Sequence, residues 1–234
     1  MLLFVAMPNN HLNMQLPDGG LIYKETNPVN LIVEPFNALS ALVFIFIALF
    51  WLYKLGGRYK QMPFLFSSTI ILMIGAIGGS IYHAFRYAAF FIMMDWLPIL
   101  ILCLMASCYF LWQAYGNLKK SILIVALVIA AQVTIWMVGN YKDRHMNINI
   151  NYALMGLTVL VPLIIYMNKT RYQQWHIIAL ALCSFFCALG CRIYDNYTDL
   201  SFGTHFLWHT FGAIACHQMF LYIYRMYTFG KSAQ

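Results

Sequence analysis

The chain has 234 residues, of which 62% are hydrophobic and only 9% are charged. An ordinary soluble domain is about half apolar and about a quarter charged, so a soluble fold is excluded. The mean hydropathy of +0.71 fits a chain whose solvent is largely lipid, and about 20 residues per spanning helix leave no room for a separate soluble domain. We therefore expect one membrane domain over residues 1–234.

Apolar runs long enough to cross a bilayer follow one another along the chain. They cover approximately residues 35–53, 62–85, 88–113, 121–139, 150–167, 175–194 and 204–228. These seven runs predict an all-α membrane protein, because the strands of a membrane barrel would alternate in polarity with period two. Residues 1–34 would form an outer segment, 35–228 a seven-helix bundle and 229–234 an inner tail.

The basic residues predict the orientation of the bundle. With the N-terminus outside, nine fall on the inner side and five on the outer side. The inner set is Lys54, Arg58, Lys60, Lys119, Lys120, Lys169, Arg171, Arg225 and Lys231, and the outer set is Lys24, Arg86, Lys142, Arg144 and Arg192. An excess of Lys and Arg marks the cytoplasmic side, so we expect an N-out, C-in topology.

The net charge of +7 does not indicate nucleic-acid binding. The basic residues stand singly or in twos and threes between apolar runs, whereas a nucleic-acid surface needs them clustered with exposed aromatic residues. All six cysteines lie inside apolar runs, so no disulfide framework is expected. No segment of the sequence identifies a protein partner.

A few ionisable side chains fall inside the predicted spans, where such groups are costly and mark functional sites by default. His83 stands near the end of the second run, Asp95 near the start of the third, and His205 and His209 at the start of the seventh. Even-numbered helices end outside and odd-numbered helices begin there. We therefore expect these residues in the same outer layer, in the periplasmic, extracellular or lumenal half of the membrane.

The histidine spacing indicates a metal site. His205 and His209, four residues apart, project from one helix face and can share a metal ion. A third ligand from His83 would leave an open fourth position, as in catalytic zinc sites. Such a zinc ion polarises a carbonyl and makes water more acidic, with Asp95 as the general base. Ser80 would either hydrogen-bond the reacting oxygen or bond back to its own helix.

Other interpretations of these residues stay open. His83 could hydrogen-bond a neighbouring helix, and Asp95 could pair with Arg86 or Arg192. Before the first span, a group of oxygen-bearing side chains suits calcium, or else complements the dipole of the first helix. This group comprises Glu25, Glu34 and Asn37.

These motifs resemble the alkaline ceramidase family, part of a superfamily of seven-helix membrane hydrolases that includes adiponectin receptors and GPI-lipid remodelling enzymes. The resemblance spans about residues 23–220 and rests on Glu34-Pro35-Phe36-Asn37 with Ser40, Gly78-Gly79-Ser80 with His83, Asp95-Trp96-Leu97-Pro98 and His205-Phe206-Leu207-Trp208-His209. The chain has Gly79 where the family usually has its serine. Tyr23-Lys24-Glu25 stands where the family has Asp-Trp-Cys-Glu.

The resemblance implies a zinc-dependent amidase that cleaves ceramide into a sphingoid base and a fatty acid. It assigns His83, His205 and His209 to zinc, Asp95 to water activation, Ser80 to an assisting role, and Glu25, Asn27 and Glu34 to calcium. Three alternatives are a hydrolase of another acyl lipid, a non-catalytic receptor or channel with a structural metal, and a haem-binding electron carrier.

Overall fold

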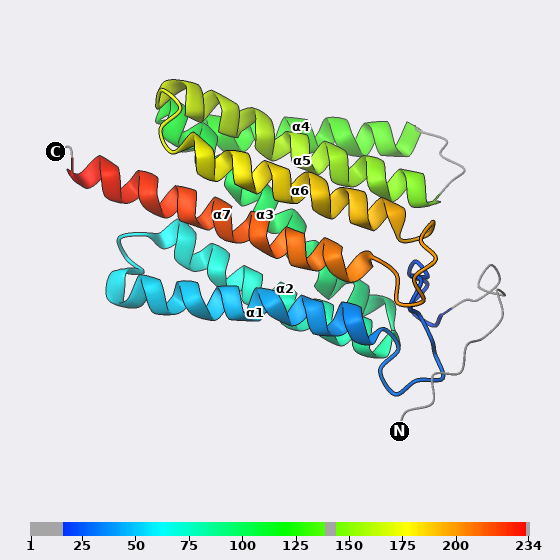
Figure 1. Ribbon diagram of the computed structural model, residues 1–234. Helices are drawn as coiled ribbons and strands as arrows, with labels where there is room; N and C mark the ends of the chain where they lie inside the picture. The colour runs from blue at the N-terminus through cyan, green and yellow to red at the C-terminus, as the bar shows by residue number, and fades with distance from the viewer. Residues whose placement is uncertain (1–15, 139–143, 233–234) are drawn as a thin grey trace.

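The computed structural model describes residues 16–138 and 144–232 (Figure 1). Within these residues the chain forms seven α-helices and one short 3-10 helix, with no strand, which confirms the all-α prediction. The elements are α1 (Pro35–Leu55), η2 (Gly56–Arg58), α2 (Pro63–Phe85), α3 (Ala89–Tyr115), α4 (Leu118–Val138), α5 (Arg144–Lys169), α6 (Trp175–Tyr194) and α7 (His205–Ser232). Parts of the predicted outer segment (1–15) and inner tail (233–234) lie outside the described residues.

Five of these helices are long and apolar enough to cross a membrane. The five segments are Pro35–Arg58, Pro63–Phe85, Ala89–Tyr115, Ile150–Lys169 and Trp175–Tyr194. Large apolar side chains such as Phe46, Leu127 and Phe186 are more than half exposed on the outside of the bundle. Such a surface is stable in lipid and unstable in water, so the protein is membrane-embedded.

Most helix ends lie within a few residues of the ends of the predicted apolar runs, and the largest difference is at the start of α5. This helix begins at Arg144, six residues before the predicted start at 150. Hydropathy marks only the part of a helix that suits the hydrocarbon layer, whereas backbone hydrogen bonding continues through polar turns beyond it. Pro35 and Pro63 stand in the first turns of α1 and α2. Proline is suited to this position, because the backbone N–H that it lacks would have no hydrogen-bond partner within the helix.

The helices form an elongated bundle in which α7 runs between α1 and α6 (Figure 1). α2 packs against both α1 and α3, and α3 continues the contacts to α4 and α5. The first turns of α7 and the last turns of α2 lie at the same end of the bundle. Residues 16–34, which precede α1, lie at this end as well, whereas the C-terminal part of α7 lies at the opposite end.

Two glycines bring α2 and α3 into close contact near this end. A Cβ atom on Gly78 would lie 2.5 Å from Cβ of Met94 and 2.7 Å from its carbonyl oxygen. A Cβ atom on Gly79 would lie 2.6 Å from Oδ1 of Asp95. Small residues at helix contacts allow close backbone approach in membranes. The carboxylate of Asp95 therefore lies against α2, one turn before His83.

The apolar core occupies the other half of the bundle. Trp51, Phe110, Leu163 and Tyr222 are each at most 1% exposed and belong to one packed cluster. They come from the C-terminal halves of α1, α3, α5 and α7. This packing holds the helices together and leaves the end near residues 16–34 for buried polar side chains.

Candidate metal centre

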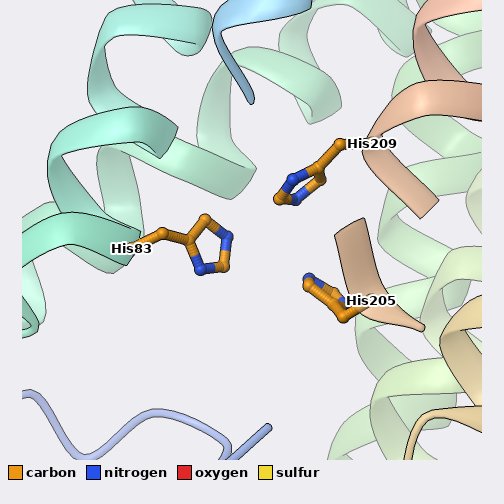
Figure 2. Close-up of side chains that lie close together, drawn as sticks. All are labelled: His83, His205 and His209. Carbon is orange, nitrogen blue, oxygen red and sulfur yellow. The ribbon is translucent and has the colours of Figure 1, made fainter. Parts of the chain in front are cut away.

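Three buried histidines gather where α2 and α7 meet. His83 comes from the last turn of α2, and His205 and His209 from the first turns of α7 (Figure 2). Each offers a ring nitrogen, and these nitrogens lie within 4.8 Å of one another. In the part of the chain that the structure describes, this is the one group of three or more His, Cys, Asp or Glu side chains with such a geometry. The structure thus brings the three predicted ligands together.

The ring of His83 is held by a carboxylate. Its Nδ1 lies 2.5 Å from Oε2 of Glu34, and both side chains are fully buried. Because a carboxylate accepts, Nδ1 carries the hydrogen, and Nε2 is left buried without a hydrogen-bond partner. A carboxylate on the far nitrogen is the arrangement that fixes the tautomer and orientation of a metal-binding histidine.

The ring of His209 is held from α1. Its Nδ1 lies 2.9 Å from Oγ of Ser40 and 3.1 Å from the carbonyl oxygen of Asn37. Ser40 donates its own hydrogen to the same carbonyl, at 3.0 Å. The oxygens therefore act as acceptors for the ring, and the network assigns the hydrogen of His209 to Nδ1. Its Nε2 keeps a lone pair for another ligand.

The third ring, His205, is positioned through its backbone and by stacking. Oδ1 of Asp195 accepts the backbone N–H groups of Thr204, at 2.6 Å, and of His205, at 2.8 Å. Asp195 thus caps the N-terminus of α7. The ring of Tyr23 stacks on His205 with centroids 3.8 Å apart. Nδ1 of His205 is buried and has no hydrogen-bond partner.

The unpaired nitrogens make the cluster a good fit for zinc. Buried polar atoms without a partner are costly, and both Nε2 of His83 and Nδ1 of His205 are in this state. Zinc prefers nitrogen and sulfur ligands, and three histidines form a known catalytic set. A cation between the rings would give each of these nitrogens a partner.

The structure places Asp95 next to the cluster but outside it. Its carboxylate contacts α2 at Gly79 and does not belong to the group of nitrogens within 4.8 Å. Among the described ion pairs, Asp95 has none with Arg86 or Arg192, so the pairing considered from the sequence is not formed. Ser80 donates to the carbonyl oxygen of Ala76 at 2.8 Å, which is the second of its two predicted roles.

Among the oxygen ligands predicted for calcium, only Oδ1 of Asn37 is buried without a donor from the described part of the protein. Glu25 accepts from the backbone N–H groups of Phe36, at 2.9 Å, and Asn37, at 2.6 Å. Oδ1 of Asn27 accepts from the N–H of Val29 at 3.1 Å. These contacts correspond to the alternative interpretation, in which a carboxylate complements the first helix.

Glu34, the third predicted calcium ligand, is saturated as well. Besides His83, it accepts from Oγ1 of Thr26, at 2.6 Å, from Nδ2 of Asn37, at 3.4 Å, and from the guanidinium of Arg86. Burial raises the pKa of Glu34, but the hydrogen bond from His83 and the charge of Arg86 outweigh burial and hold the pKa below its ordinary value. The predicted set does not fit a calcium ion.

Several contacts around the histidines are not apparent from the sequence. Glu34 and Ser40 belong to the predicted first-helix motif, but their pairing with His83 and His209 is not encoded by spacing. Asp18 and Tyr23 lie in the segment before α1, where no apolar periodicity indicates which side chains turn inward. The sequence shows only that each is an acidic or aromatic residue in a segment that is expected on the same side of the membrane as the histidines.

Comparisons with protein-family models and with curated proteins identify no relative of this chain. A scan against protein-family models finds no match, and a search of curated proteins finds none either. The chemical interpretation therefore depends on the residues of the site and on the motif resemblance.

Proposed function

We propose that this protein is a zinc-dependent intramembrane hydrolase that cleaves the amide bond of a ceramide-like lipid, releasing a sphingoid base and a fatty acid. The observation that carries the proposal is the buried cluster of three histidines, each offering a ring nitrogen within 4.8 Å of the others. Two of these histidines, His83 and His205, also have a buried ring nitrogen without a hydrogen-bond partner. The motif resemblance to alkaline ceramidases supports the amide and the lipid substrate.

The chemistry would be divided between the histidines and Asp95. When bound, zinc supplies Lewis acidity that polarises a carbonyl and acidifies water. His83, His205 and His209 would hold it, with Glu34 and Ser40 fixing two of the rings. Asp95 of α3, whose carboxylate lies against α2 at Gly79, one turn before His83, would take the proton from water and return it to the departing nitrogen. Burial in the bundle keeps this proton transfer away from bulk water.

We also propose that all seven helices span the membrane, with the N-terminus outside. α4 and α7 have 21 and 28 residues, and about 20 suffice to cross a bilayer. Residues 16–34 and the C-terminal part of α7 lie at opposite ends of the bundle, as an odd number of spans requires (Figure 1). The metal centre would then lie in the outer layer, where a lipid amide near the headgroups can reach it from the bilayer.

The first test is the metal content of the protein purified in mild detergent. We expect about one zinc per chain, lost in a His205→Ala, His209→Ala double variant. The matched control is His217→Ala, because His217 lies on the same helix but contacts Phe50 and Trp51 instead. A wild-type protein without zinc under conditions that preserve zinc in other proteins would contradict the proposal.

The second test separates a hydrolase from a receptor with a structural metal. Asp95→Asn is expected to keep the zinc and to lower ceramide hydrolysis by at least about 100-fold, because the substituted side chain cannot accept the proton. Full hydrolysis by this variant would exclude Asp95 as the general base. Zinc binding without hydrolysis of ceramide or of another acyl lipid by the wild-type protein would favour the receptor.

A further inference from the structure

Two buried carboxylates converge on one guanidinium beside the metal centre. Nε of Arg86 donates to Oδ2 of Asp18, and Nη2 donates to Oδ1 of the same residue at 3.3 Å. Nη1 donates to Oε1 of Glu34. Arg86 is 1% exposed, Asp18 4% and Glu34 0%, so the whole group is removed from solvent.

The guanidinium also has a neutral oxygen and an aromatic ring. Nη2 donates to the carbonyl oxygen of Leu21 at 2.8 Å, and the guanidinium carbon lies 4.7 Å from the ring centre of Tyr82. Two carboxylates and a backbone carbonyl are the oxygen ligands that a calcium ion takes from proteins. In this chain these oxygens accept hydrogen bonds from the guanidinium of Arg86 instead.

The backbone at Arg86 indicates that this side chain is needed at this position. Arg86 ends α2 with φ of +54°, in the left-handed region that glycine adopts without strain. A residue with a Cβ atom is disfavoured in this conformation. The strain is offset by contacts that only a long, forked cation can make with Asp18 and Glu34 at the same time.

We infer that Arg86 is a built-in substitute for a divalent cation, which holds residues 16–34 against α2 and makes the metal centre independent of calcium. Through Glu34 the guanidinium orients His83, so Arg86 is a positioning residue and not a ligand. The inference rests on the proposed function only in treating His83 as a metal ligand. It accounts for the saturated carboxylate of Glu34, one of the predicted calcium ligands.

The test compares the full-length protein in calcium-free buffer and in about 5 mM CaCl2, above the affinity range of weak calcium sites. The readouts are the thermal unfolding midpoint and the zinc content. For the wild type we expect both to be unchanged by calcium. Loss of stability or of zinc in calcium-free buffer would overturn the inference.

The deciding variant is Arg86→Gly, because glycine relaxes the left-handed backbone and any loss then comes from the missing side chain. We expect an unfolding midpoint lower by on the order of 10 °C, since two buried carboxylates lose their cation, and a reduced zinc content. Calcium should restore part of the midpoint. A variant equal to the wild type, or one that calcium does not stabilise, would overturn the inference.

Two further variants complete the test. Arg171 is an exposed arginine with φ of +51° in the turn before α6, so Arg171→Gly is a matched control that should keep the wild-type midpoint and zinc content. Arg86→Lys keeps the charge and loses the fork, so its midpoint should lie between those of the wild type and Arg86→Gly, and it should gain less from calcium than Arg86→Gly does. A midpoint of Arg86→Lys that rises with calcium as much as that of Arg86→Gly would overturn the inference. None of these readouts requires lipid hydrolysis, so a failure of the proposed activity would be seen separately.

Discussion

At the scale of single residues, the histidine cluster depends on the side chains that contact each ring. Glu34 binds Nδ1 of His83, and Ser40 lies against Nδ1 of His209. Tyr23 covers the face of His205. Each contact fixes a ring without occupying the nitrogens that remain for a metal. The cluster is thus preorganised by residues from α1 and the segment before it, which lie outside the group of three histidines.

Glu25 makes stability depend on pH. Burial raises the pKa of its carboxyl to about 7, although two backbone N–H groups lower it, whereas the ordinary value is 4.5. The folded state therefore binds this proton more tightly than the unfolded state, and the contribution of Glu25 to the free energy of unfolding falls as the pH rises through this range. We expect the unfolding midpoint to fall more steeply over this range in the wild type than in Glu25→Gln.

The matched control for this prediction is Asp199→Asn, which removes an exposed carboxylate from the loop between α6 and α7. It should keep the pH dependence of the wild type. Parallel pH profiles for the wild type and Glu25→Gln would show that the carboxyl is ionised throughout the range, contrary to the expectation.

At the scale of helices, the contact between α2 and α3 sets the position of Asp95. A methyl group at Gly79 would meet the carboxylate of Asp95, which can move, whereas one at Gly78 would meet the backbone of Met94, which cannot. We therefore expect Gly79→Ala to lower hydrolysis about 10- to 100-fold with the zinc content retained. Gly78→Ala should instead lower the unfolding midpoint by separating the two helices.

Gly190 provides the control for both substitutions, because a Cβ atom there has no neighbour within 4 Å. Gly190→Ala should keep activity and raise helix stability slightly, by up to about 1 kcal/mol, since alanine favours the helix. Unchanged hydrolysis in Gly79→Ala, measured on protein with full zinc, would mean that Asp95 does not need its present position.

At the scale of the whole molecule, the sequence predicts the helices better than it predicts the buried polar contacts. Long apolar runs are a local signal, so all seven helices are found, and the errors lie at helix ends. The polar first turns of α5 are missed, and α7 continues to Ser232, through residues predicted as the inner tail. Helix parity is enough to expect His83 near His205. The pairing of Arg86 with Asp18 and Glu34 joins residues 68 and 52 positions apart, and no local pattern encodes it.

The membrane topology can be tested by locating the two ends of the chain. The proposed seven spans would place the two ends of the chain on opposite sides of the membrane, and the excess of Lys and Arg predicts that the C-terminal end is inside. In intact cells that express the protein, an epitope at the N-terminus should bind antibody, and one at the C-terminus should bind it only after permeabilisation. A cytoplasmic marker protein reports whether the cells are intact. Two ends accessible from the same side would require an even number of spans, and one of α4 and α7, but not both, would then lie outside the hydrocarbon layer.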